Sequence, residues 1–475
     1  MTRDVVLGFD SSTQSTKVVA MSVDTGEVLG IGRAPHTGED TQNPLDWVEA
    51  LVQATAEAVT TEMRVLGLAV AAQQHGLVTI DSGGKPVRPA SLWNNTDAAV
   101  DAERLNSEAD FARLVGSRLV ASFTIAKLAW LGRVHPNELT RTAKVCLPHD
   151  WLNFVLTGNM VTDRGDASGS GWWSPLLNRH MPELIDLAIG EANRLRIEFP
   201  RVLGPDALAG KLKPGLAQGL GLLAGTPVAA GTGDNMAAAL GVGATPEELV
   251  VSLGTSGTAF GLSLHATTEQ SGMVAGFADA TGHYLPLVCM LNCTKVVDSV
   301  AKLAGLDTVE ALDLAERSPP GAEGLMLVPY FGGERTPNLP GATGSLLGVR
   351  YGNLTRDLVV RAAVDGVSAG LAACVEGLES QGLQARSLSL VGGGSRHPTW
   401  QQSIADATGK VVEVLGGVEH VARGAAIQAA AMVRQEPVAD VVRLWRPETL
   451  ADQRPRPEYR DAFRLEERRL LWADR

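Results

Sequence analysis

The apolar and polar positions repeat one arrangement in each half of the chain. Near the start, the apolar runs 5–9 and 18–21 flank a polar segment that is rich in Ser and Thr. Halfway along, the apolar runs 249–253 and 259–262 flank a second such segment of Gly, Ser and Thr. Two β-branched apolar runs on either side of a short polar segment predict a β-hairpin in each place. The repetition indicates two related lobes.

Around these hairpins, strand-like runs alternate with segments of helical periodicity in both halves, which predicts an α/β fold with two lobes. A less regular helical region is expected over about 97–215, and a surface helix over the last ~25 residues. We place the lobes at 1–243 and 244–475, with a hinge near 241–246. The expected strands are 5–9, 16–22, 27–32, 65–72 and 387–391, and the second half repeats the strand-rich opening over 249–263 and 273–291. The expected helices are 44–63, 355–381, 398–408 and 421–435.

The composition is that of an ordinary globular protein, with 45% hydrophobic and 20% charged residues in a chain of 475. A net charge of −12 argues against nucleic acid or an anionic membrane as a main partner. The opening residues lack the apolar region of a signal peptide, and we find no apolar stretch of about 18 residues. The four cysteines lack metal-type spacing and suggest reduced thiols. We therefore expect a cytoplasmic protein.

The two hairpin turns are candidate phosphate-binding loops. A turn of small residues lets several backbone N–H groups converge on an anion, and the hydroxyls add further donors. Either turn alone is more simply explained as ordinary turn chemistry, but their duplication favours the shared phosphate ligand. Asp10 at the end of the first strand adds a carboxylate that could hold Mg²⁺ directly or through water.

Asp234 is the strongest candidate for a catalytic residue. The apolar run 227–230 leads into Gly231-Thr232-Gly233, and Asp234 then opens an Ala-rich helix. A carboxylate at this position could accept the proton of a hydroxyl that attacks phosphorus. The alternative is that Asp234 only caps the helix. The two phosphate loops favour the proton acceptor.

Two further polar segments suit a ligand rich in hydroxyl groups. Gln74 and His75 follow the strand predicted at 65–72, and Trp93 and Asn94 offer an indole and an amide. A structural role for His75, and a core position for Trp93, are the alternatives. The triplet 392–394 follows another strand, where glycines would let a base or ribose approach the backbone, or would simply form a tight turn.

In this order, the motifs resemble the FGGY family of carbohydrate kinases over essentially the whole chain. The matching segments are Asp10–Lys17, Gln74–Gly76, Phe123–Leu128, Gly233–Asn235, Leu253–Gly257, Gly333–Pro337 and Gly392–Ser395. The resemblance implies the duplicated ribonuclease H-like fold that actin and hexokinase share, with a catalytic cleft between the two lobes. Within the family, the chain is most similar to the members that convert D-xylulose to D-xylulose 5-phosphate.

The resemblance further implies ATP and Mg²⁺ as cofactors, a sugar as substrate, and the role of each site residue. Asp234 would be the proton acceptor, and Asp10 would serve Mg²⁺ and phosphate, with Asp234 as a second carboxylate near the metal. The first lobe would bind the sugar and the second ATP. The resemblance is also compatible with a homodimer. The sugar would contact Gln74, His75, Trp93, Asn94, Asp234 and Asn235, and ATP would contact Ser12, Thr13, Gln14, Lys17, Gly254, Thr255, Ser256, Gly393, Gly394 and Ser395.

The chain departs from the family pattern at a few positions. Ser12 replaces a Gly, Gln74 stands where a Met is often found, and Asn95 and Asp97 stand where Asp and Arg are usual. The last two changes alter the charge on the sugar side. They leave another ketose, a pentitol or an aldonate open as substrate. A more remote alternative is an actin- or chaperone-like ATPase without a sugar substrate.

Overall fold

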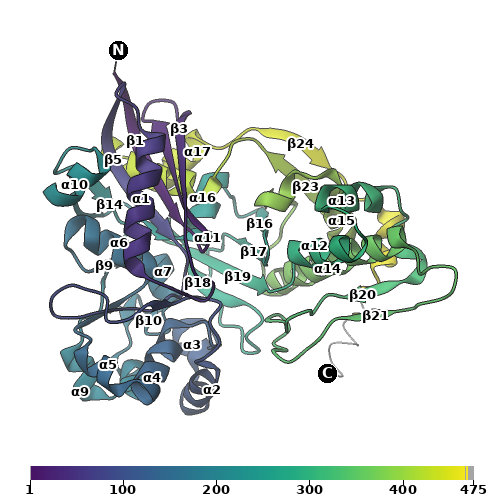
Figure 1. Cartoon of the computed structure of the whole chain (residues 1–475), viewed down its shortest axis with the longest axis horizontal. Helices are drawn as coiled ribbons and strands as arrows, with labels where there is room; N and C mark the ends of the chain where they lie inside the picture. Colours follow the sequence, from purple (N-terminus) through teal and green to yellow (C-terminus); the bar gives the residue numbers. More distant parts are fainter. Residues whose placement is uncertain (1, 466, 469–475) are drawn as a thin grey trace.

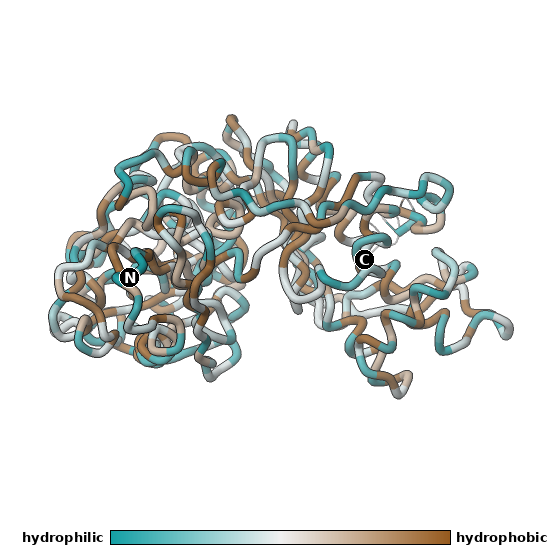
Figure 2. Tube along the Cα trace, turned by 90° about the horizontal axis from the view of Figure 1, so that it is seen from above, coloured by the Kyte–Doolittle hydropathy of each residue, from teal (hydrophilic) through white to brown (hydrophobic). Residues whose placement is uncertain are grey.

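The computed structural model describes residues 2–465, 467 and 468. It contains two seven-stranded sheets, one formed largely by each half of the chain. Figure 1 shows the first sheet on the side of the N-terminus and the second sheet leading toward helices α12 to α15 on the other side. Figure 2, from above, shows the same two masses side by side along the long axis.

The first sheet has the order β13-β14-β5-β1-β2-β3, and β15 also pairs with β5. β1 is antiparallel to β2 and parallel to β5, so the hairpin predicted at the start of the chain is confirmed. Its strands are β1 (Arg3–Ser11), β2 (Ser15–Ser22), β3 (Val28–Pro35), β5 (Met63–Ala72), β13 (Leu208–Lys211), β14 (Pro227–Ala229) and β15 (Thr232–Gly233).

The second sheet repeats this plan in the order β18-β19-β17-β16-β22-β23-β24. β16 is antiparallel to β17 and parallel to β22, as β1 is to β2 and β5. The duplication inferred from the two hairpins is therefore present in the topology. The strands are β16 (Glu248–Leu253), β17 (Gly257–Gly261), β18 (Ala275–Ala278), β19 (Tyr284–Met290), β22 (Ser387–Val391), β23 (Val411–Leu415) and β24 (Thr449–Gln453).

Helices and short strands make up the remainder of the first half, including the region expected to be irregular. They are β4 (Thr41–Gln42), α1 (Pro44–Ala58), β6 (Val78–Ile80), β7 (Ala90–Ser91), α2 (Ala99–Glu108), α3 (Phe111–Val115), α4 (Thr124–Val134), α5 (Pro136–Arg141), β8 (Lys144–Cys146), α6 (Pro148–Thr157), β9 (Val161–Asp163), α7 (Arg164–Ser168), β10 (Trp173–Ser174), β11 (Arg179–His180), α8 (Pro182–Ile189), α9 (Glu191–Arg196), β12 (Arg201–Leu203), α10 (Pro214–Leu220) and α11 (Asp234–Val242).

The second half adds helices to its sheet, and the long helix α14 lies in the core. The prediction that the chain has no apolar stretch of about 18 residues was wrong, since α14 is long and apolar enough to cross a membrane. However, 83% of its most apolar stretch is buried inside the protein. It is a core helix. The elements are α12 (Thr294–Leu303), α13 (Thr308–Glu316), η1 (Ala322–Gly324), β20 (Met326–Val328), β21 (Ser345–Leu347), α14 (Arg356–Ser380), η2 (Gly393–Arg396), α15 (Pro398–Thr408), α16 (His420–Arg434), α17 (Val438–Leu444) and η3 (Pro457–Phe463).

One helix from the second half of the chain packs on the first sheet. The buried face of α16 contains Ala422, Ala425, Ala426 and Ala429, which belong to the same apolar core as strand β1 and helix α11. A Cβ on Gly424 would lie 1.8 Å from the carbonyl oxygen of Ala237, so α16 and α11 cross at backbone contact. This contact joins the two halves behind the site.

Two sequence predictions were wrong at their ends. The helix predicted over 44–63 ends at Ala58, because Met63 pairs with Arg3 as the first residue of β5. Within the last ~25 residues, where a surface helix was predicted, the described part is helical only in η3 and at 465, 467 and 468. That part begins within β24, which pairs with β23, and continues into the short helix η3. Residues 466 and 469–475 of the same prediction lie outside the described residues.

Candidate active site

The strands of the first sheet bring the predicted polar residues to one edge. β1, β5 and β15 are parallel, with Ser11 paired to Ala72 and Ala72 paired to Gly233. Asp10, the pair Gln74–His75 and Asp234 therefore lie at the carboxyl ends of adjacent strands. This edge is where open α/β sheets commonly bind ligands.

Asp234 is held in a defined orientation at the first turn of α11. The backbone N–H and the side-chain amide of Asn235 both donate to its Oδ1, at 2.8 and 2.9 Å. The N-cap residue is Gly233 and not Asp234, so capping does not explain this acid. The carboxylate is half-buried, and burial together with the charge of Asp10 raises the pKa of Asp234 to about 7. Such a carboxylate can accept a proton near neutral pH.

Asn235 connects Asp234 to both halves of the chain. Its side-chain amide also donates to Oε1 of Gln74 at 2.9 Å. The side-chain Oδ1 of Asn235 accepts a hydrogen bond from the hydroxyl of Thr258, on strand β17, at 3.3 Å. Asn235 thus ties the acid to Gln74 and to the second sheet.

Asp10 lies buried beside Lys17 and next to Asp234. The ammonium of Lys17 is 3.5 Å from Asp10 Oδ2 and 2.8 Å from Glu419 Oε2, and the hydroxyl of Ser12 donates to Asp10 Oδ1. Burial raises the pKa of Asp10, and the charge of Lys17 opposes this rise. The paired acids raise the pKa of Lys17, against the effect of burial.

The donor set at this edge fits a divalent cation. Mg²⁺ prefers carboxylate oxygens and phosphates, and two carboxylates here repel each other strongly enough to raise a pKa. Asp10 and Asp234 are the residues that would hold it. Bound Mg²⁺ would supply charge neutralisation on the transferred phosphate.

Gln74 presents an unused donor at this strand edge. Its Oε1 is taken by Asn235, whereas its buried Nε2 has no hydrogen-bond partner among the described residues. A buried amide N–H without a partner costs about 1–3 kcal/mol. A ligand hydroxyl or carbonyl would recover that cost.

His75 is a neutral imidazole in this site. Its Nδ1 lies 2.8 Å from the carbonyl oxygen of Gly169, which can only accept, so the hydrogen is on Nδ1 and Nε2 is an acceptor. Burial, together with Arg335 and Lys127, lowers the pKa of His75 to about 3. The ring packs on Phe123 and Phe277 at 4.9 and 5.4 Å between centroids. His75 can therefore accept from a sugar hydroxyl but carries no charge.

Lys127 fixes the backbone at His75. His75 has a φ of 64°, in the left-handed region that is uncommon for a residue other than glycine. Its carbonyl oxygen accepts from the buried ammonium of Lys127 at 2.9 Å and from the hydroxyl of Thr124 at 3.2 Å. These bonds come from the 123–128 segment and explain its place in the motif set.

The Trp93 segment lies beside the first loop. The indole N–H of Trp93 donates to the hydroxyl of Thr13 at 2.9 Å, and the exposed Asn94 donates to the backbone of Glu39. The amide of Asn95 donates to Asp40 at 3.0 Å and to Asp97 at 3.1 Å. The two unusual residues, Asn95 and Asp97, thus bind each other. Direct contacts of Trp93 and Asn94 with a sugar stay predictions.

The second loop and the glycine triplet lie together at one end of the second sheet. β16 and β22 are neighbours, with Ser252 paired to Val391, so residues 254–256 and 392–395 follow adjacent strand ends. The carbonyl of Gly254 accepts from both N–H and hydroxyl of Thr294, at the start of α12. A Cβ on Gly393 would meet nothing within 4 Å, so the triplet has an open face.

Models of the FGGY family of carbohydrate kinases match almost the whole chain. The N-terminal domain matches residues 5–241, and the C-terminal domain matches residues 249–433. The chain belongs to the FGGY family of carbohydrate kinases. It is therefore a phosphotransferase with an alcohol group as acceptor, and its family uses ATP and sugars as substrates.

Among FGGY relatives, the xylulose kinase of Streptomyces rubiginosus is 42% identical over 93% of this chain and 90% of its own. The crystal structure of xylulose kinase from Bifidobacterium adolescentis is 34% identical, with a TM-score of 0.85 over 98% of this chain and 99% of the other. The gluconate kinase of Lactobacillus acidophilus has a TM-score of 0.90 over 99% and 98% of the two chains, but only 19% identity, so it supports the fold alone.

Several residues of this FGGY site were not found from the sequence. Glu419 binds Lys17 from a position more than 400 residues later, and Thr258 reaches Asn235 from the second sheet. Only Lys127 carried a signal, as part of the 123–128 motif. Contacts made by tertiary packing leave no local pattern.

Proposed function

We propose that this FGGY kinase transfers the terminal phosphate of ATP to D-xylulose and forms D-xylulose 5-phosphate. The observation that carries the proposal is the arrangement at the strand edge, where Asp234 lies beside Asp10 and is linked through Asn235 to Gln74. The identity to the Streptomyces xylulose kinase supports the choice of sugar.

Asp234 acts as the proton acceptor. Phosphoryl transfer has a loose transition state, so alignment and charge neutralisation supply most of the rate. Asn235 orients the carboxylate through Oδ1, and the other oxygen is left to accept the proton of the attacking hydroxyl. With a pKa of about 7, Asp234 can take this proton at neutral pH and release it to water afterwards.

The sugar lies on the first lobe, 1–243, and ATP mainly on the second, 244–475. Gln74 donates through its unpaired Nε2 and His75 accepts through Nε2, so the pair can bind neighbouring groups of a ketose. Trp93, whose indole N–H donates to Thr13, and Asn94 next to it contact the sugar from the side of the first loop. A cytoplasmic location and a homodimer complete the proposal.

On the ATP side, the backbone amides of both loops bind phosphate. The first loop uses Ser12, Thr13 and Gln14 with Lys17, and the second uses Gly254, Thr255 and Ser256. Gly393, Gly394 and Ser395 take the adenosine. Asp10 and Asp234 would hold Mg²⁺. A lower pKa of Asp234 in the presence of Mg²⁺ would support this assignment.

A coupled assay of ADP release tests the proposal. The panel contains D-xylulose, D-ribulose, L-ribulose, xylitol, D-arabitol, glycerol and gluconate, each with MgATP. The proposal requires kcat/KM for D-xylulose to exceed every other value by about tenfold, or about 1.4 kcal/mol. A higher kcat/KM for another compound of the panel would retain the phosphoryl transfer and reject D-xylulose as the substrate. Turnover that ignores every sugar would favour the ATPase alternative.

A further inference from the structure

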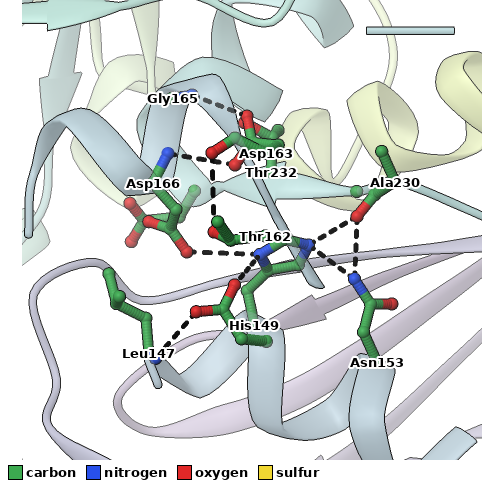
Figure 3. Close-up of polar contacts among 12 residues, drawn as sticks. Leu147, His149, Asn153, Thr162, Asp163, Gly165, Asp166, Ala230 and Thr232 are labelled. Carbon is green, nitrogen blue, oxygen red and sulfur yellow. Dashed lines mark hydrogen bonds and ion pairs between the residues drawn. The ribbon is translucent and has the colours of Figure 1, made fainter. Parts of the chain in front are cut away.

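A cluster of buried charged residues lies directly behind the segment that carries Asp234. His149 and Asp150 are on helix α6, and Asp163 and Asp166 are on β9 and α7. Figure 3 shows how the side chains of His149, Asp163 and Asp166 converge near Ala230 and Thr232. His149, Asp150 and Asp166 are fully buried, so the cluster contacts no solvent.

The contacts of His149 define where its hydrogens lie. Nε2 is 2.7 Å from the carbonyl oxygen of Ala230, which can only accept, so Nε2 carries a hydrogen. Asn153 Nδ2 donates to the same oxygen at 2.8 Å and lies 2.9 Å from Nε2, so two N–H groups lie side by side on this one carbonyl. On the other side of the ring, Nδ1 lies 3.2 Å from Asp150 Oδ1 and 3.4 Å from Asp166 Oδ2. An ionised carboxylate cannot donate, so a second proton has to lie between Nδ1 and these two acids.

The same cluster contacts each residue between Ala230 and Asp234. Asp163 accepts a bond from the hydroxyl of Thr232 at 2.6 Å, and its other oxygen accepts from the N–H of Asp166 at 3.0 Å. A Cβ on Gly233 would lie 2.8 Å from Asp166 Oδ1, so this acid packs directly against the loop. The position of Asp234 therefore depends on the charge balance behind it.

A proton explains the cluster better than a metal ion. His149 Nδ1, Asp150 and Asp166 lie close enough together to be considered as ligands of a cation. A zinc site, however, requires four donors in most cases. Asp163, the next acid, has both oxygens engaged by Thr232 and backbone N–H groups. Hydrogen bonds to Asp150 and Asp166 raise the pKa of His149 well above its usual range, against the effect of burial.

We propose that His149 is a positioning residue for phosphoryl transfer: as a buried cation between Asp150 and Asp166, it holds the carbonyl of Ala230 and so places Asp234. The carbonyl of Ala230 and the hydroxyl of Thr232 are the two points at which the cluster fixes the loop. Since a displacement of about 1 Å in a catalytic group can cost about 100-fold in rate, the effect should appear in kcat. The inference rests on Asp234 being the proton acceptor.

Two variants at His149 separate charge from hydrogen bonding. His149→Gln keeps a neutral donor for Ala230 and loses the cation, whereas His149→Lys keeps the cation. We expect His149→Gln to lower kcat about 10- to 100-fold, with KM for ATP and for the sugar changed by less than about threefold. His149→Lys should recover most of this loss. Adding Asp150→Asn to His149→Gln should also recover activity, because it removes the carboxylate nearest to Nδ1, whose charge the cation balances.

The results that would overturn the inference are equally distinct. They are a folded His149→Gln variant with kcat within about twofold of wild type, or a double variant whose losses multiply. About one transition-metal ion per chain, measured by mass spectrometry and removed with loss of activity, would also overturn it. If His149→Gln does not fold, Thr232→Val serves instead, and unchanged kcat there would reject the proposal. An active Asp234→Ala variant would instead reject the proton acceptor itself.

Discussion

Asp234→Asn should make the protein more stable while it abolishes sugar phosphorylation. Asp234 is ionised at pH 8 in a half-buried position beside Asp10, which raises its pKa from 3.8 to about 7. At about 1.36 kcal/mol per unit, the full shift corresponds to about 4 kcal/mol of destabilisation. Solvent screening reduces this figure, and the favourable position of a carboxylate at the start of α11 opposes it by about 0.3–1 kcal/mol. We expect a net gain of about 1–2 kcal/mol, or about 1–2 °C in Tm for a chain of 475 residues.

The pH dependence of this gain has a defined sign. Between pH 3.8 and 7, folded wild-type protein binds the proton that the unfolded chain has released, so its stability rises as the pH falls. The advantage of Asp234→Asn should therefore be full above pH 7 and shrink toward pH 4. Mg²⁺ should also reduce it, because a cation favours ionised Asp234.

Thermal unfolding followed by circular dichroism at pH 5 and pH 8 measures the effect. Asp357→Asn is the matched control, since Asp357 also lies in the first turn of a helix, α14, but a hydrogen bond with Thr355 lowers its pKa. That variant should lose stability at pH 8. An Asp234→Asn variant that is less stable than wild type at pH 8, or a difference that ignores pH, would refute the reasoning.

Four other substitutions test the site. Gly393→Ala adds a methyl group in open space and should raise KM for ATP about threefold with unchanged Tm. Gly392→Ala should instead lower Tm in thermal melts. Gly392 has a φ of 91°, and its Cβ would lie 2.6 Å from a carbonyl oxygen. Gln74→Leu should raise KM for D-xylulose about tenfold, the value of one buried hydrogen bond, and leave KM for ATP unchanged in initial-rate assays. Lys17→Met should raise KM for ATP about tenfold with little effect on KM for the sugar, and equal effects on both would contradict its assignment to the phosphate side.

The sequence could predict the parts of this structure that follow from local patterns. The strand at 387–391 and the helix at 398–408 have the predicted bounds, and both hairpins are present. Each is a short apolar run with clear turn residues at its ends. Asp234 was found for the same reason, since it lies between a strand, glycines and a helix.

Contacts between distant segments could not be predicted in this way. Lys17 pairs with Glu419, and α16 packs on the first sheet, because the chain returns to its starting lobe before β24 completes the second sheet. His149 and Asp166 belong to no motif in the sequence. They are unusual because they are ionisable side chains that are fully buried, and only the tertiary structure shows this burial. The predicted end of helix α1 was wrong because Met63 pairs with Arg3 as the first residue of strand β5.

The most direct test of the account compares wild type with Asp234→Ala in sugar-dependent ADP release with MgATP and D-xylulose. Loss of a positioned general base predicts a fall in kcat of about 10²–10⁴-fold, with the fold retained by circular dichroism. Retention of more than about a tenth of wild-type kcat would contradict the role of Asp234 as proton acceptor.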